Sequence, residues 1–305
     1  MSRPTAVVVG CRWRERQGEP AFAIRSLAGA ASRNATVTVL APGDPERVEA
    51  DGAFDLRGLG SGPEGMPADT TVFVDDLTPE ATGLLAGIVR PRVFFLLGVD
   101  GAARPGWRRL ELVAGDDPLC VHVPVNRLAE RHRHHGFGFT DYLLVLGNRA
   151  GDHPDPPPAA AWLSAAFTDA DVVVVENGVA AAWKGRTLRG RVSVDTRMDL
   201  WRLIAHARTC VDLAPGNLIA RECIESLRFG TPIMVPEHSG PAEVHARAGG
   251  GSVFGNRDEL LTAVGHLQDT AHRSVVSLAG RRYADERYGN PAALVDRVKG
   301  LIDAE

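Results

Sequence analysis

Glu222 and Glu225 stand three positions apart in a stretch that we expect to be helical, so their carboxylates share one helix face. Two carboxylates could suggest acid–base hydrolysis, but neighbours on one helix lie too close together to flank a scissile bond. Glu225 has apolar neighbours, and a carboxylate buried among them needs hydrogen-bond donors. A ligand with vicinal hydroxyls, such as a ribose, could supply these donors. Alternatively, Glu225 lies on the solvated helix face and pairs with Arg221 or Arg228.

The residues around this pair predict the local structure that would position it. We expect a helix over residues 219–229, a tight turn at Gly230-Thr231-Pro232, and a short buried strand over residues 233–235. A loop follows, and a new helix is expected to begin near Pro241, since proline is favoured at the first helical position. Glu225 would therefore lie on a helix that precedes a buried strand.

Apolar runs bounded by turn residues predict two sets of strands that alternate with helices. The strands are expected at residues 6–10, 36–41, 71–74, 93–97 and 119–123, and then at 142–147, 172–175, 192–194, 210–213, 233–235 and 252–254. The helices are expected near residues 20–32, 79–89, 157–167, 198–207, 219–229, 259–268, 274–287 and 291–302. Continuous apolar strands alternating with helices are typical of parallel sheets covered on both faces. Two sets in series predict two doubly wound, Rossmann-like domains.

The expected domains are residues 1–138, residues 139–290, and a C-terminal helix in residues 291–305 that packs back on the first domain. Ligands of such sheets bind beyond the carboxyl ends of the strands. We therefore expect the two domains to face each other across a cleft that holds the site.

Composition limits the classes of function. The chain has 305 residues, of which 44% are hydrophobic and 24% charged, which is enough for two cores of ordinary size. Its net charge is -4, so no nucleic-acid partner is expected. The only lysines are Lys184 and Lys299, a bias toward arginine that is typical of high-GC, actinobacterial genomes.

The four cysteines are Cys11, Cys120, Cys210 and Cys223, and none forms a CxxC pair. We expect them to be reduced, as in a cytoplasmic protein. The first residues hold too short an apolar run for a signal peptide, and no run approaches about 18 apolar residues, so no transmembrane helix is expected. Peripheral contact with a membrane stays open.

Residues 216–244 resemble the nucleotide-sugar site of retaining GT-B glycosyltransferases of the family-4 type. Glu225 and Gly230-Thr231-Pro232 fall in register with a glutamate and a Gly-Thr-Pro of the family. The first glutamate of the family's pair is replaced here by Asn217, and the family's Gly-Phe-Gly by Leu218-Ile219-Ala220. In the family this segment handles the donor sugar. The resemblance therefore implies a catalytic position for Asn217 and donor contacts from Leu218 and Ile219.

The resemblance extends to other positions that are expected to bind the donor. Arg149 and His153 follow the first strand of the second domain, where the family places an arginine and a lysine for the diphosphate. Gly178 matches a glycine turn after the next strand. Gly18 matches the opening glycine-rich loop, and His122 is a candidate for the family's histidine near the donor sugar. For each residue, an ordinary surface, turn or loop role remains the alternative.

Several other kinds of site are not expected. The histidines His132, His134 and His135 match no zinc motif, and no metal is expected. Walker A, GxSxG and HExxH motifs are absent from the sequence. The loop after the first strand, GCRWRER, is not a GxGxxG, which argues against a nicotinamide dehydrogenase.

The resemblance thus implies a GT-B glycosyltransferase without a cofactor. It would move a sugar, with retention, from a nucleotide-diphosphate donor to an unknown small-molecule, glycan or lipid-linked acceptor. Two alternatives remain open. One is a non-catalytic GT-B protein that binds a nucleotide or a partner enzyme, which Asn217 favours. The other is a nucleotide-sugar 2-epimerase.

Overall fold

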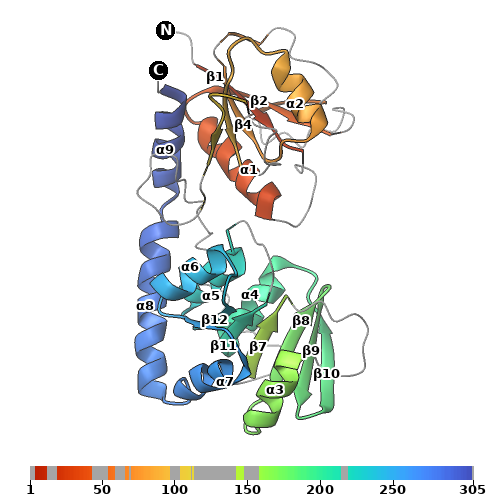
Figure 1. Cartoon of the computed structure of the whole chain (residues 1–305), viewed down its shortest axis with the longest axis vertical. Helices are drawn as coiled ribbons and strands as arrows, with labels where there is room; N and C mark the ends of the chain where they lie inside the picture. The colour runs from red at the N-terminus through yellow and green to blue at the C-terminus, as the bar shows by residue number, and fades with distance from the viewer. Residues whose placement is uncertain are drawn as a thin grey trace. The chain divides into compact units, whose positions relative to one another are not determined.

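The computed structural model describes residues 4–11, 19–42, 54–58, 66–68, 70–96, 104–110, 112, 142–147, 158–213 and 219–303 (Figure 1). The chain forms two compact units. Unit 1 comprises Met1–Pro124 with Asn290–Glu305, and unit 2 comprises Val125–Gly289. Three of the expected elements lie partly or wholly outside the described residues, namely the strand at 119–123, the end of the strand at 93–97 and the first residue of the helix near 157–167.

Unit 1 contains a sheet of parallel strands in the order β3-β2-β1-β4-β5-β6. The strands are β1 (Thr5–Val9), β2 (Thr36–Ala41), β3 (Phe54–Gly58), β4 (Thr71–Val74), β5 (Arg92–Phe95) and β6 (Arg108–Arg109). This order, with the first strand in the middle and the chain winding outward both ways, is that of a doubly wound Rossmann-like sheet. The strands β3 and β6 were not predicted, because their sequences FDLRG and RR carry no apolar run.

The described part of unit 1 contains the helices α1 (Glu19–Ala31), α2 (Pro79–Ala86) and α9 (Pro291–Asp303). The side chain of Thr78 accepts a hydrogen bond from Ala81 N at 3.2 Å, which caps α2 at its start. The helix ends at Ala86, short of the expected residue 89. The C-terminal helix α9 packs against α1, and Nη2 of Arg92 donates to the carbonyl oxygen of Ile302 at 2.8 Å.

In unit 2 the described residues form a sheet of seven strands in the order β10-β9-β8-β7-β11-β12-β13. Its strands are β7 (Tyr142–Leu146), β8 (Val172–Glu176), β9 (Val179–Lys184), β10 (Thr187–Ser193), β11 (Ala207–Asp212), β12 (Ile233–Pro236) and β13 (Ser252–Phe254). Its helices are α3 (Pro158–Ala166), α4 (Arg197–His206), α5 (Arg221–Phe229), α6 (Pro241–Ala248), α7 (Arg257–His266) and α8 (Thr270–Tyr288).

The helices of unit 2 cover both faces of its sheet (Figure 1). Alternate residues of β7 belong to two separate cores: Tyr142 and Leu144 to one, Leu143 and Val145 to the other. The first core includes side chains from α4, α5, α6 and α8, and the second includes side chains from α3 and α7. A strand buried on both faces reads as a continuous apolar run, which is why YLLVL was recognised in the sequence.

The second sheet departs from the expected parallel arrangement only at its β9–β10 edge. The strands β9 and β10 are antiparallel to their neighbours, and residues 179–184 had not been predicted as a strand. Asn177 and Gly178 form the two-residue connection between β8 and β9, with φ of 48° and 78°. Positive φ at both central residues is the requirement of a type I′ hairpin turn, and Asn-Gly is its preferred sequence. The other strand pairs of this sheet are parallel, so the predicted doubly wound α/β class is confirmed.

Candidate functional site

The carboxyl edge of the unit 2 sheet is where its topology places a ligand. From β7 the chain passes to β8 on one side and later returns to β11 on the other side, which makes the β7–β11 boundary a topological switch point. The two strand ends are joined there by a hydrogen bond from Leu213 N to Leu146 O of 2.9 Å. Because β8 and β10 both run antiparallel to β9, β10 also ends at this edge. The helices α4 and α5, which follow β10 and β11, therefore both begin at the carboxyl edge.

The start of α4 is fixed by a capping box. Thr196 Oγ1 accepts from the backbone N–H of Asp199 at 3.2 Å, and the Asp199 carboxylate accepts from Thr196 N at 3.1 Å. Arg197 is consequently the first helical residue, where its side chain reaches toward α5.

The start of α5 has an unusual backbone. Ala220, the N-cap residue, has φ of 49° and ψ of 56°, a left-handed conformation that L-residues other than glycine seldom adopt. Its side chain is too short to cap the helix. The preceding carbonyl, Ile219 O, is held at 2.7 Å from Nε2 of His245 on α6. A carbonyl only accepts, so Nε2 carries the proton. His245 thereby fixes the chain immediately before α5.

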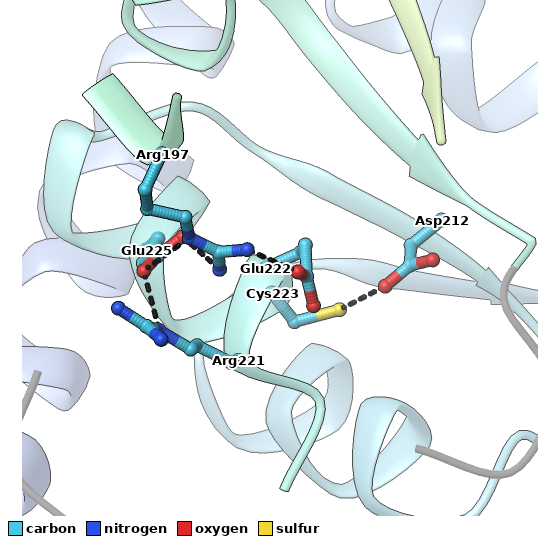
Figure 2. A network of polar contacts seen from close by, with 6 residues as sticks. All are labelled: Arg197, Asp212, Arg221, Glu222, Cys223 and Glu225. Atoms are coloured by element: carbon cyan, nitrogen blue, oxygen red, sulfur yellow. Dashed lines mark hydrogen bonds and ion pairs between the residues drawn. The ribbon is translucent and has the colours of Figure 1, made fainter. Parts of the chain in front are cut away.

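Two arginines and two glutamates meet between these helix starts (Figure 2). We call Arg197, Arg221, Glu222 and Glu225 the Arg–Glu cluster. Nε of Arg197 donates to Glu225 Oε1 at 3.0 Å, and its Nη2 donates to Glu225 Oε2. Its Nη1 donates to Glu222 Oε1 at 2.5 Å. Nε of Arg221 donates to Glu225 Oε1 at 2.8 Å.

The carboxylate of Glu225 is buried, with a side-chain exposure of 0%, whereas its partners are partly open to solvent. The exposed fractions are 29% for the side chain of Arg197, 19% for Arg221 and 24% for Glu222. The alternative that placed Glu225 on a solvated helix face was therefore wrong, although Arg221 is indeed a partner. Arg228, the other expected partner, instead lies 3.2 Å from Asp285 Oδ1. The two arginines satisfy the buried carboxylate, so its burial by itself does not require a ligand.

The charges of the cluster shift one another's protonation equilibria. Burial by itself would lower the pKa of Arg197, but Glu225 and Glu222 outweigh burial and raise it. Burial lowers the pKa of Arg221, with Glu225 opposing that effect and the charge of Arg197 adding to it. Burial would raise the pKa of Glu222, but the charge and hydrogen bond of Arg197 hold it below its ordinary value. Arg197 and Glu222 thus each favour the charged form of the other.

Arg197 is a site residue that sequence reasoning missed. Its pairing with Glu225 spans 28 positions, and no local pattern signals such a contact. The helix start itself could have been found, because Thr196 and Asp199 have the spacing of a capping box.

The thiol of Cys223 lies next to this cluster (Figure 2). Its Sγ donates to Oδ2 of Asp212, the last residue of β11, at 3.2 Å. Burial, and then the charge of Asp212, raise the pKa of Cys223 well above its ordinary value. Burial likewise raises the pKa of Cys210. Both cysteines are free and buried, and a protonated thiol is a poor nucleophile, so neither has the chemistry of a catalytic cysteine.

The remaining predicted residues divide into two groups. Gly178 lies in the β8–β9 turn, where its φ of 78° gives a structural reason for glycine, and Ile219 is buried beside the start of α5. Gly18, His122, Arg149, His153, Asn217 and Leu218 lie outside the described residues. In the chain, Arg149 and His153 follow β7, and Asn217 and Leu218 stand between β11 and α5.

Within the described residues no group of three or more His, Cys, Asp and Glu side chains is arranged to hold a metal ion. In the same part of the chain, no helix combines the length and apolar character needed to cross a membrane.

Comparison with solved structures identifies proteins of the same architecture. Sucrose-phosphate synthase from Thermosynechococcus elongatus aligns with a TM-score of 0.59 at 13% identity, covering 96% of this chain and 96% of that chain. HepE of Anabaena, solved in complex with UDP and glucose, aligns with a TM-score of 0.57 at 12% identity, covering 97% and 98%. A glycosyltransferase from Rickettsia africae aligns with a TM-score of 0.58 at 9% identity, covering 100% of both chains.

At such low identities the likeness shows the fold. The chain has the GT-B type of architecture that these glycosyltransferases share, with two units each built on a mainly parallel sheet. The GT-B prediction is therefore confirmed at the level of fold. No protein-family model matches the chain, and no curated protein matches it in sequence.

Proposed function

We propose that the chain transfers a sugar from a nucleotide-diphosphate donor to an acceptor hydroxyl, with retention of configuration at the anomeric carbon. The observation that carries this proposal is the position of Glu225, a buried carboxylate beside the carboxyl edge of a doubly wound sheet. It gains support from the fold, which is shared over nearly the whole chain with glycosyltransferases, one of them solved with UDP and glucose.

In this proposal the second unit binds the nucleotide. The carboxylate of Glu225 accepts hydrogen bonds from the ribose hydroxyls, and Gly178 lets the backbone approach the nucleotide closely. Arg149 binds the diphosphate, because a guanidinium matches phosphate oxygens in geometry as well as in charge. His153 adds to the diphosphate site when its imidazole is protonated.

The donor sugar is assigned to the segment between β11 and α5. Asn217 takes the place of a glutamate of the resembling family, and its amide can both donate to and accept from sugar hydroxyls. Leu218 and Ile219 complete the donor contacts. For the first unit the resemblance alone supplies candidates, which are Gly18 of the opening glycine-rich loop and His122 as the family's histidine near the donor sugar.

The chemistry requires no enzymatic nucleophile. The bond between the anomeric carbon and the diphosphate oxygen breaks while the acceptor oxygen bonds to that carbon. The departing diphosphate oxygen takes the proton of the acceptor hydroxyl. Catalysis then rests on holding donor and acceptor in register and on stabilising the negative charge of the diphosphate, which is the role given to Arg149. The acceptor is a small molecule, a glycan or a lipid-linked molecule, and the last of these would bring the chain to a membrane surface.

A second candidate is a non-catalytic protein that binds a nucleotide or a partner enzyme. It is favoured by two observations. Asn217 stands where the resembling family has a glutamate, and Glu225 is already neutralised by Arg197 and Arg221.

A thermal-shift panel of UDP, GDP, ADP and dTDP with their sugar conjugates, combined with an assay for release of the free sugar, tests the proposal. A true ligand at 100 times its dissociation constant should stabilise the folded chain by about 2.7 kcal/mol. A shift with sugar release supports a transferase. A shift without release from any donor supports the non-catalytic candidate, and no shift with any compound overturns nucleotide binding by the wild-type chain.

A further inference from the structure

The hydrogen bonds of Glu225 leave little room for a ligand. An ionised carboxylate offers about four acceptor positions, two on each oxygen. Oε1 accepts from Nε of Arg197 at 3.0 Å and from Nε of Arg221 at 2.8 Å, so both of its positions are occupied. Oε2 accepts from Nη2 of Arg197, which leaves one position on that oxygen.

This arrangement conflicts with a ribose diol. A vicinal diol that binds a carboxylate through both hydroxyls donates one hydrogen bond to each oxygen. Because Oε1 of Glu225 already has two donors, the diol and both arginines exceed the acceptor capacity of the carboxylate. One arginine must release Glu225 before the diol binds in this way.

The geometry points to Arg197 as the arginine that leaves. Arg221 sits on the same helix as Glu225, one helical turn before it, so their contact is local. Arg197 belongs to α4 and reaches across to α5, where it also contacts Glu222 at 2.5 Å. Since the Arg197 and Glu222 side chains are 29% and 24% exposed, Arg197 can withdraw toward solvent while it keeps its bond to Glu222.

We propose that Arg197 is a latch on Glu225, whose carboxylate it holds with its forked guanidinium until a ribonucleoside diphosphate binds. The two ribose hydroxyls of the nucleotide then replace this guanidinium as hydrogen-bond donors to Glu225. This inference rests on the proposed function, because it assumes that Glu225 receives the ribose. The latch keeps the buried carboxylate neutralised before the nucleotide binds, and part of the ligand's binding free energy is used to break it. Arg197 thus lowers the affinity for ribonucleotides but not for nucleotides that lack the diol.

This selectivity separates a latch from a merely structural ion pair. Isothermal titration calorimetry would compare UDP, GDP and ADP with their 2′-deoxy counterparts on the wild type and on Arg197→Gln. The latch predicts that Arg197→Gln tightens ribonucleotide binding about tenfold, the equivalent of one hydrogen bond to a charged group, and leaves the 2′-deoxy compound nearly unchanged. Arg282→Gln is the matched control, because Arg282 forms an exposed ion pair with Glu286 on α8, and both affinities should stay the same.

A second variant covers the case in which Arg197→Gln does not fold. Lysine keeps the charge at position 197 but has no planar fork to hold both carboxylate oxygens, so Arg197→Lys should tighten ribonucleotide binding in the same direction by a smaller factor. Thermal melting of each variant shows which of them is folded and can be used for the calorimetry.

The outcomes are distinguishable from failure of the proposed function. Ribonucleotide binding that is weakened or unaltered in the Arg197 variants, with the wild type binding normally, overturns the latch and leaves the function intact. Equal gains for ribose and 2′-deoxy compounds also overturn it. Binding by a variant but not by the wild type supports the latch in its strongest form, whereas no binding by any form overturns the nucleotide site itself.

Discussion

Nε of Arg197 lies 3.0 Å from Oε1 of Glu225 and ties the first turn of α4 to the middle of α5. The two helices begin after different strands, β10 and β11, and the contact joins residues 28 positions apart. Such a forked contact has two consequences. It holds two helix starts together beside the carboxyl edge of the sheet, and it makes each charge depend on the other, because a buried ion left without its partner is costly.

Glu225→Gln should therefore destabilise the folded chain. The substitution leaves two arginines facing a neutral amide, and breaking a buried ion pair costs about 3 kcal/mol or more. Urea unfolding should show a lower midpoint, while Glu286→Gln, in an exposed pair on α8, should leave the midpoint almost unchanged. A Glu225→Gln variant as stable as the wild type would mean that the cluster contributes nothing to the fold.

The pKa of Glu222 gives the cluster a defined pH dependence. Arg197 holds this pKa below the ordinary value of 4.5, so the carboxyl binds protons more weakly in the folded than in the unfolded chain. Its contribution to stability is complete above about pH 4.5 and is lost as pH falls through the lowered pKa. The difference in free energy of unfolding between the wild type and Glu222→Gln should shrink as pH falls from 6 toward 3. Urea unfolding of both proteins at intervals of about half a pH unit measures this difference. A difference that stays constant over that range would contradict the pairing with Arg197.

Particular residues show why the fold could be predicted more completely than the site. Strands such as YLLVL can be recognised in the sequence, because burial on both faces of a sheet requires an uninterrupted run of apolar residues. The β8–β9 hairpin was missed although Asn177-Gly178 is a strong turn signal, because the alternation of parallel strands and helices was extended across it.

The partners of Glu225 were harder to predict for a physical reason. Arg221 was a candidate because helical spacing limits the choice to neighbours on one face. Arg197 is brought to Glu225 by packing of α4 against α5, and no sequence period encodes a contact between two helices that follow different strands.

His245 should be the residue that holds the chain in place before α5. It is fully buried, its Nε2 donates to Ile219 O at 2.7 Å, and in the neutral ring Nδ1 accepts from the hydroxyl of Tyr283 at 2.9 Å. His245→Phe would leave the buried Ile219 carbonyl without this donor, at a cost of about 1–3 kcal/mol.

A glutamine variant distinguishes the stability contributed by this hydrogen bond from that contributed by packing of the ring. The amide of His245→Gln can donate to Ile219 O, so this variant should recover part of the stability that phenylalanine loses in chemical unfolding. Equal losses for both substitutions would show that ring packing, and not the bond to Ile219, is what matters.

Gly230→Ala should be destabilising because two effects coincide there. Gly230 ends α5 with φ of 75°, and the left-handed region costs other residues about 1–2 kcal/mol. A Cβ at this position would also meet the guanidinium of Arg281, which donates to Phe229 O at 2.9 Å. Gly265→Ala on α7 is the control, since a Cβ there meets no atom within 4 Å and alanine favours the helix. The melting temperature should fall for Gly230→Ala and hold or rise for Gly265→Ala; the reverse order would refute the argument.

Asn217 should determine which donor sugar is used, if the chain is an adapted enzyme. A glutamate at this position only accepts hydrogen bonds and carries a charge, whereas an asparagine amide donates and accepts without charge. We expect Asn217→Glu to change the preferred sugar or abolish turnover, with nucleotide affinity largely unchanged, because the nucleotide is assigned to Glu225 and Arg149 instead.

If the chain only binds, the wild type will release no sugar from any donor, and Asn217→Glu could restore slow hydrolysis. Sugar release from a panel of donors, measured for both proteins and for Asn217→Ala, separates these outcomes. Wild-type activity that neither substitution alters would show that the donor sugar binds elsewhere in the chain.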